Sequence, residues 1–237
     1  MKEQSQEQNQ LWKKFVSIPH QLIVDKSIST IEFYLYFLLK KHMNHSTWKT
    51  KTSQHMLKKN LNIADNRTLI GKLRKLKESK YIDYNFDKFP NKAEFIEIKI
   101  INLKSQYESL DLELYEQINK VINIDLLPQA IRLIYYYIKN YNPDFDSMGI
   151  KGLACPSYTE INKECKIKLN DITVINNIFH ENMICEVIEG EWYLSEYFNK
   201  PMKGRNRYIP NIIINTKNHE RRYHKHITVR KNNYIQN

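Results

Sequence analysis

The clearest helix signals in the chain lie in Thr52–Ile82, TSQHMLKKNLNIADNRTLIGKLRKLKESKYI. Thr52 or Ser53 is suited to cap a helix through residue 59, because short hydroxyl side chains accept hydrogen bonds from the first free amides of a helix. A short turn over 61–63 follows, and Asp65 caps a further helix that reaches about residue 80. Apolar residues recur in that helix at the spacing of a half-buried helix, so basic side chains are expected on its solvent side.

The flanking segments extend this pair of helices to a complete unit. Upstream, Ser29 and Glu32 have the spacing of a capping box and open a helix to residue 43 that is apolar almost all round, as in a central core helix. Downstream, residues 81–86 read as a strand, 87–92 as a turn and 95–101 as an alternating strand. The predicted order is helix, helix, turn, basic helix and hairpin.

This order resembles the winged helix-turn-helix family. The turn Leu61–Ile63 has the L-x-I pattern, and the stretch from Leu73 to Ile82 has the L-x-x-L-x-x-x-x-x-I pattern that leads into the wing. The resemblance implies that the helix after Asp65 is a recognition helix and that the following hairpin is a wing. A generic three-helix bundle can mimic these patterns and stays open as an alternative.

The same order of elements recurs further along the chain. Pro128 suits the first turn of a helix that ends before Pro143, and Ser157 or Thr159 caps a helix through residue 165. Cys165-Lys166-Ile167 repeats the pattern of Leu61–Ile63, and a helix over 170–182 and strands over 183–188 and 208–215 follow. We therefore expect a mainly α fold with small β-hairpin wings (α+β), built from two winged-helix domains in tandem. A helical second domain of unrelated topology is the alternative.

Charge is segregated along the chain. The formal net charge of +11 divides into +10 over 1–104, −8 over 105–198 and +9 over 199–237. Two basic blocks around an acidic one favour a polyanion partner for the ends, with the acidic middle as an interaction or spacer surface. The predicted organisation is a disordered tail at 1–10, winged-helix domains at 11–104 and 126–215, an acidic helical linker at 105–125, and a basic tail at 216–237.

Composition excludes several classes of protein. The chain has only 5 Gly and lacks a Walker loop, a G-x-S-x-G and an H-E-x-x-H motif, so we expect no enzyme and no cofactor. Cys155, Cys165 and Cys185 lack the close spacing of zinc ligands, so no metal is expected. No apolar run is long enough to span a membrane, and residues 1–10 are polar and lack the apolar core of a signal peptide, which predicts a cytoplasmic protein.

The first recognition helix has the chemistry to bind duplex DNA. Lys and Arg neutralise phosphates, and a helix that enters the major groove presents its first residues to base edges, where Arg reads guanine and Asn reads adenine. Lys72 and Lys75 are expected on the solvent side, where they suit backbone contacts, and the hairpin tip suits a minor-groove or phosphate contact. The DNA-binding residues predicted in this domain are Lys51, Ser53, Lys58, Lys59, Asn66, Arg67, Thr68, Lys72, Arg74, Lys75, Lys88, Asn91 and Lys92.

The second domain is less basic than the first in its predicted recognition helix. Its predicted recognition helix, 170–182, contains no Lys or Arg, so phosphate contacts would come from residues around it. The residues predicted to bind DNA here are Lys166, Lys168, Asn170, Thr173, Asn176, Asn177, Lys203, Arg205 and Arg207. The alternative is that this domain dimerises and never enters a groove.

Tandem winged helices of this size resemble plasmid replication initiators of low-GC bacteria and phage replication-organiser proteins, on stretches such as Phe15–Pro19 and Arg207–Asn211. The resemblance implies a sequence-specific, homodimeric binder of double-stranded DNA that controls replication or transcription of such an element. In those initiators the second unit often supplies the strongest DNA contacts, whereas here the first recognition helix is the more basic. A winged-helix adaptor that recruits a protein partner through 105–125, and a binder of single-stranded nucleic acid, are the alternatives.

Overall fold

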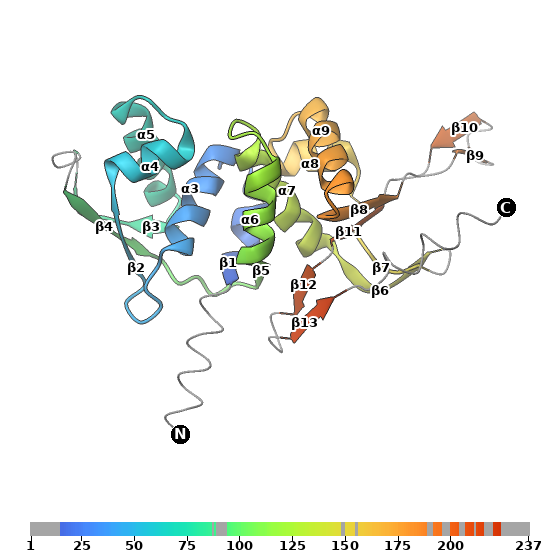
Figure 1. The fold of residues 1–237 in the computed structure, drawn as a ribbon, viewed down its shortest axis with the longest axis horizontal. Helices are drawn as coiled ribbons and strands as arrows, with labels where there is room; N and C mark the ends of the chain where they lie inside the picture. The colour runs from blue at the N-terminus through green and yellow to red at the C-terminus, as the bar shows by residue number, and fades with distance from the viewer. Residues whose placement is uncertain are drawn as a thin grey trace, which may run out of the picture.

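A computed structural model describes residues 15–86, 88, 94–147, 150–154, 156–188, 192–195, 200–203, 207–210, 212–215 and 220–223. Over 142–153 and beyond Cys185 it describes the backbone alone. Helices alternate with small antiparallel sheets, which confirms the predicted mixed α+β class. Figure 1 shows α3, α6 and α7 at the centre, with α4 and α5 on one side and α8 and α9 on the other. The predicted tail at 1–10 lies outside the described residues, and of 216–237 only 220–223 is described.

The first half has a winged-helix-like order of elements. They are α3 (Thr30–Lys41), β2 (Lys49–Ser53), α4 (Gln54–Leu61), α5 (Asn66–Glu78), β3 (Ile82–Asp83) and β4 (Phe95–Ile100). The three strands form one antiparallel sheet in the order β2-β4-β3. Strand β2 was not anticipated from the sequence, because its lysines and threonines carry no apolar alternation. Strand β2 is nevertheless bound to α3, since the hydroxyl of Thr50 donates a hydrogen bond to the carbonyl of Leu39 at 2.6 Å.

The helix boundaries in this half follow the predicted caps. The capping box of Ser29 and Glu32 is present at the start of α3. The side chain of Ser53 accepts a hydrogen bond from the amide of Met56, and that of Asp65 accepts one from the amide of Thr68. These three caps confirm the predicted starts of the helices to within a residue or two. Ser53 is buried, because its side chain caps α4, and this limits the contact with DNA that was predicted for it.

The second half begins with α7 and contains mostly two-stranded pairs. Strand β6 pairs with β7, β8 with β11, β9 with β10 and β12 with β13, each antiparallel. The elements are α7 (Leu127–Asn140), β6 (Asn142–Ser147), β7 (Ile150–Leu153), α8 (Tyr158–Cys165), α9 (Leu169–Glu181), β8 (Cys185–Ile188), β9 (Trp192–Ser195), β10 (Lys200–Lys203), β11 (Arg207–Pro210), β12 (Ile212–Asn215) and β13 (Glu220–Tyr223).

Helices α8 and α9 repeat the geometry of α4 and α5. Both α4 and α8 have 8 residues, and both α5 and α9 have 13. A serine caps α4 and α8, at Ser53 and Ser157, and both helices end on a left-handed residue, Asn62 with φ 52° and Lys166 with φ 58°. A second left-handed residue follows α5 and α9 as well. Helix lengths and backbone turns thus recur although the side chains differ.

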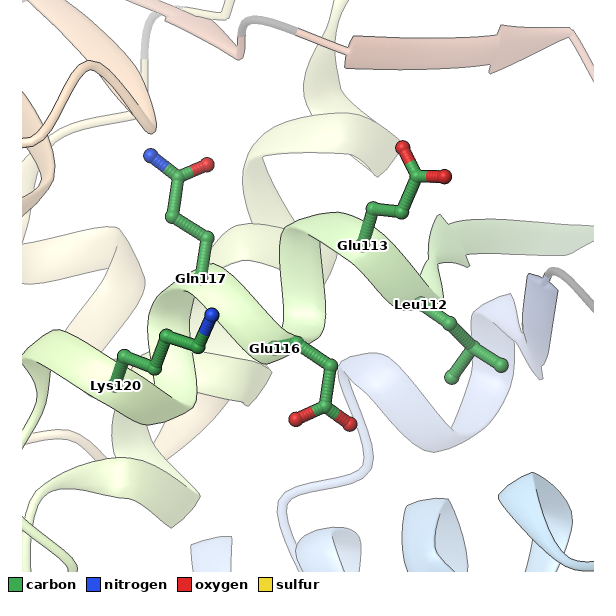
Figure 2. Close-up of a pocket in the computed structure, with 5 residues that line it drawn as sticks. All are labelled: Leu112, Glu113, Glu116, Gln117 and Lys120. Carbon is green, nitrogen blue, oxygen red and sulfur yellow. The ribbon is translucent and has the colours of Figure 1, made fainter.

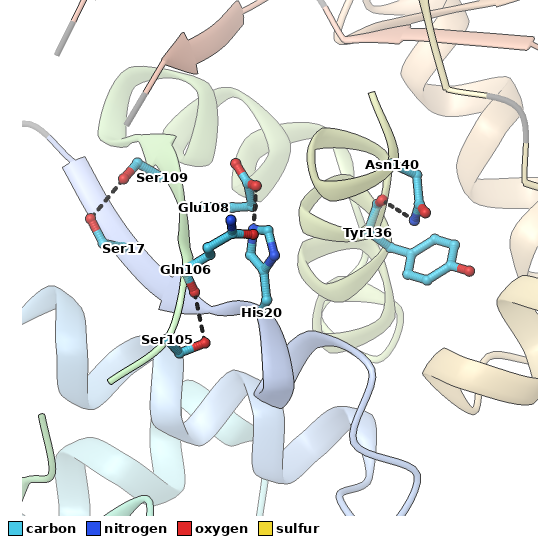
Figure 3. Close-up of polar contacts among 8 residues, drawn as sticks. All are labelled: Ser17, His20, Ser105, Gln106, Glu108, Ser109, Tyr136 and Asn140. Atoms are coloured by element: carbon cyan, nitrogen blue, oxygen red, sulfur yellow. Dashed lines mark hydrogen bonds and ion pairs between the residues drawn. The ribbon is translucent and has the colours of Figure 1, made fainter. Parts of the chain in front are cut away.

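The segment between the two halves is built into the core. Strand β1 (Phe15–Pro19) pairs with β5 (Tyr107–Asp111), and α6 (Leu112–Val121) follows directly. Figure 3 shows the hydroxyl of Ser17 beside that of Ser109, 2.7 Å apart, on these paired strands. The segment 105–125, which we expected to be helical, therefore starts with a strand. Pairing with β1, which lies some 90 residues away along the chain, makes a strand of Tyr107–Asp111, and the expected helix begins only at Leu112.

The two halves share one hydrophobic core. Helix α3 packs against both α5 and α7, and buried residues of both halves form a single cluster. At its centre lies Arg132 of α7, whose side chain is fully buried. Among the described residues, no helix is both long enough and apolar enough to pass through a membrane.

Candidate nucleic-acid interface

Helix α5 has a buried face and an open one. Leu69, Leu73 and Leu76 are fully buried against the core. Arg67, Gly71 and Arg74 are exposed and follow one another at intervals of four and three residues, so they form one stripe along the helix. The stripe carries two guanidinium groups whose charge is permanent. This face is the strongest candidate for contact with a polyanion.

The first turn of α5 is stabilised by Asp65. Its carboxylate accepts hydrogen bonds from the amide of Thr68 at 2.8 Å and from the hydroxyl of the same residue at 3.0 Å. The hydrogen bond from the Thr68 amide, with a further one from the amide of Arg67, holds the pKa of Asp65 below its usual value. Asn66 also has a partner, because Lys58 Nζ donates to its side-chain oxygen at 3.0 Å. Asn66, Arg67 and Thr68 all remain exposed, as a helix end that reads bases requires.

Lys72 does not lie free on the solvent side as the sequence suggested. It is half-buried, and its Nζ is 3.1 Å from Glu32 Oε1 at the start of α3. Glu32 is buried and also closes the capping box of α3. Position 72 stands beside the buried leucines rather than opposite them, so its ammonium reaches across to α3. Lys72 thus fastens α5 to the core instead of extending toward solvent.

Other predicted cations lie on α5 and on the elements next to it. Lys75 is half-buried on the flank of the stripe, whereas Lys51 on β2 and Lys59 on α4 are exposed. Helices α4 and α5 pack against one another. Lys77, in contrast, is occupied, since its Nζ lies 3.1 Å from Asp83 and over the ring of Tyr84.

Two further predictions concern Ser53 and the wing. Ser53 is buried as the cap of α4, so its side chain is not exposed for the predicted contact with DNA. Lys88 is exposed near the end of the wing, and Asn91 and Lys92 lie outside the described residues. At the base of the wing, Phe95 is 70% exposed.

The corresponding helix of the second half presents a different surface. Asn176 is buried, accepts a hydrogen bond from the hydroxyl of Tyr137 at 2.8 Å and donates to the hydroxyl of Tyr158 at 3.2 Å. Its side chain is therefore not exposed for the predicted contact with bases. It lies on the stripe of Ile172 and Phe179, which faces the core. The sequence pattern did not place it there, because an Asn is rarely assigned to a buried face.

The exposed side chains of α9 include polar and apolar residues but no Lys or Arg. The predicted residues Asn170, Thr173 and Asn177 are exposed, and Leu169 and Val174 beside them are exposed as well. Lys166 and Lys168 are exposed before the helix. Of the remaining predicted residues, Lys203 and Arg207 lie in β10 and β11, whose side chains are not described, and Arg205 lies outside the described residues.

The described residues give little support to metal or thiol chemistry. They contain no group of three His, Cys, Asp or Glu side chains that could hold a metal ion. Burial raises the pKa of Cys165 to about 12, so its thiol is protonated at neutral pH. Cys185 is buried too, and Cys155 lies outside the described residues.

Sequence reasoning overlooked one residue of the α5 face. Gly71 stands in the middle of the exposed stripe, between Arg67 and Arg74. A single glycine inside a helical pattern is the signal that could have singled it out, because it lowers helix stability and so asks for a reason.

Comparisons with known proteins do not assign the chain to a family. No protein-family model matches the chain. No curated protein matches it either. Among solved structures, the chain is similar to one described as "Crystal structure of Pi initiator protein in complex with iteron DNA", with 11% identity and a TM-score of 0.31, over 83% of this chain and 96% of that chain. A TM-score this low is below the level at which two folds agree.

Proposed function

We propose that the chain binds double-stranded DNA through the exposed face of α5. The observation that carries this proposal is the stripe with Arg67 and Arg74, opposite the buried leucines. An α-helix fits the major groove, and permanently charged guanidinium groups bind phosphates or the guanine edge. Lys51 and Lys59 add positive charge on the elements next to α5. In the first turn the side-chain amide of Asn66 is exposed, and its nitrogen is suited to donate to a base edge.

The repeated geometry supports a tandem winged-helix protein. Helix α9 occupies the same place in the second half as α5 in the first and ends in the same kind of turn. With no cation on it, α9 is suited to base contacts through Asn170 and Asn177 or to a second copy of the chain. A homodimer of such units would recognise two half-sites about one helical turn, or a multiple of it, apart. We propose that it controls replication or transcription of a plasmid- or phage-like element, without catalysis.

Fluorescence anisotropy with labelled mixed-sequence DNA tests the central part of the proposal. The full chain should bind duplex more tightly than the matching single strand. The log–log plot of affinity against salt should fall with a slope of about −0.9 for each phosphate neutralised. Binding that is absent, or that does not change with salt, would contradict a phosphate-directed interface. Selection from a random duplex library, followed by light scattering of the complex, then tests sequence preference and dimerisation.

A protein partner at α6 is a second candidate function. Figure 2 shows Glu113, Gln117 and Lys120 projecting from one side of α6, along a shallow hollow that Leu112 and Glu116 complete. Two of these side chains are used within the chain, since Glu116 pairs with Lys41 and Gln117 donates to the carbonyl of Asn182. A basic partner would be attracted to Glu113. Exchanging Glu113→Lys should abolish such an interaction and leave duplex binding intact, as affinity measurements with each ligand can show.

A further inference from the structure

Nothing in the described structure requires a glycine at position 71. Gly71 lies in the sixth position of a 13-residue helix, is exposed, and a Cβ placed on it meets no atom of the described residues within 4 Å. It therefore neither makes room for a neighbouring side chain nor adopts a backbone conformation that other residues avoid. Glycine is among the poorest residues for a helix interior, so its presence here weakens α5. A glycine of this kind is used where another molecule approaches the backbone closely.

The surroundings of Gly71 indicate what that molecule is. On a helix the neighbours of position 71 on the surface are positions 67, 68, 74 and 75. These are Arg67, Thr68, Arg74 and Lys75, of which three are cations. The hydroxyl of Thr68 already donates to Asp65, so the cations alone remain to bind a ligand. Two guanidinium groups and an ammonium around a bare patch of helix suit a phosphate, which Arg binds with two parallel hydrogen bonds.

We propose that a phosphate of the duplex backbone packs directly on α5 at Gly71, between Arg67 and Arg74. This inference rests on the proposed function and assigns a position within that interface. A side chain at position 71 would hold the phosphate away from the helix and lengthen its hydrogen bonds to both guanidinium groups. Gly71 is thus a positioning residue, which acts by leaving room rather than by making a contact of its own.

Substitutions at Gly71 separate stability from binding. Gly71→Ala should raise the thermal midpoint by about 2–4 °C, because Ala is the better helix former and the space is open. The same variant should raise the Kd for a mixed-sequence duplex about fivefold, as expected when a methyl group blocks a close contact. Gly71→Leu should raise it further. Asn119→Leu, at an exposed position of α6, is the control for added apolar surface and should bind as the unchanged chain does.

The salt dependence distinguishes a steric effect from an electrostatic one. Gly71→Ala removes no charge, so its log–log salt slope should equal that of the unchanged chain, whereas Arg74→Ala should lower the slope by about 0.9. If the unchanged chain binds duplex with a steep salt slope and Gly71→Ala binds as tightly or more tightly, this inference is wrong while the proposed function stands. A loss of affinity without a higher thermal midpoint would also overturn it, because the helix itself would then be altered. If the unchanged chain does not bind duplex at all, the proposed function fails first.

Discussion

The guanidinium of Arg132 on α7 donates to the backbone carbonyl of Ile28 at 2.6 Å, although the two residues lie 104 positions apart in the chain. The same guanidinium donates to the carbonyls of Ile23 and Asp25, at 3.0 and 2.9 Å. It thereby binds three carbonyls in the connection between β1 and α3. One buried side chain of the second half thus fixes the chain entering the central helix of the first.

Removing Arg132 should destabilise the whole molecule. Arg132→Ala would remove this donor from the carbonyls of Ile23, Asp25 and Ile28, of which that of Asp25 keeps the amide of Ile28 at 3.1 Å. A buried polar group that is left unpaired costs about 1–3 kcal/mol, and the core also loses the packing of a large buried side chain. We expect a loss of at least about 3 kcal/mol in the free energy of unfolding, measured by urea titration. Arg132→Lys should recover part of it, because an ammonium cannot reach all three carbonyls.

The shape of the unfolding curve provides a second check on Arg132. The unchanged chain should unfold in one transition, because both halves share a core. Arg132→Ala should broaden or divide it, and Arg67→Ala, which removes an exposed arginine, should stay within about 0.5 kcal/mol. A variant without Arg132 that unfolds like the unchanged chain would show that the hydrogen bonds to the first half contribute nothing.

Lys40 predicts a pH dependence of stability. Its side chain is buried, with Nζ 4.3 Å from the centre of the Trp48 ring, and burial lowers its pKa from 10.5 to about 8. Between these two values the unfolded chain holds a proton that the folded chain has released, so stability contributed by this group rises as the pH rises. Below about pH 8 both states are charged and the full penalty of burying the ammonium applies.

The variant Lys40→Met isolates that contribution. The difference in free energy of unfolding between the variant and the unchanged chain should favour the variant most below pH 8 and shrink from there toward pH 10. Urea titrations at several pH values measure it. A difference that stays constant over this interval would show that the ammonium is not buried as the structure places it.

Asn176 should matter for stability and not for DNA binding. Asn176→Ala would remove two hydrogen bonds, the one that Asn176 accepts from the hydroxyl of Tyr137 and the one that it donates to the hydroxyl of Tyr158, and each such bond contributes about 0.5–1.5 kcal/mol. Duplex affinity should not change. Asn177→Ala, at the exposed neighbouring position, is the matched control and should leave stability unchanged. Thermal unfolding and anisotropy titration of the two variants give the comparison, and a loss of duplex affinity in Asn176→Ala alone would restore the role predicted from sequence.

The sequence predicted the elements of α5 and its neighbours because their signals are local. The caps at Ser29, Ser53 and Asp65 act within four residues, and apolar spacing separates the buried leucines of α5 from its exposed stripe. Features that depend on partners far along the chain escaped it. Strand β1 finds β5, and Lys72 finds Glu32. No sequence pattern indicates either contact. The sequence could therefore predict the helix that carries the candidate site, but not that Lys72 forms an ion pair within the fold.

Lys72 and Arg74 should therefore behave differently although they are two residues apart on the same helix. Arg74 is exposed on the stripe, so Arg74→Ala should weaken duplex binding and lower the salt slope by about 0.9. Lys72→Ala breaks the ion pair with the buried carboxylate of Glu32 and should chiefly reduce stability, with little change in the salt slope. Lys72→Met keeps the length of the side chain and separates lost packing from lost charge. Equal losses of duplex affinity and of salt slope in Lys72→Ala and Arg74→Ala would mean that Lys72 leaves Glu32 for a phosphate when DNA binds.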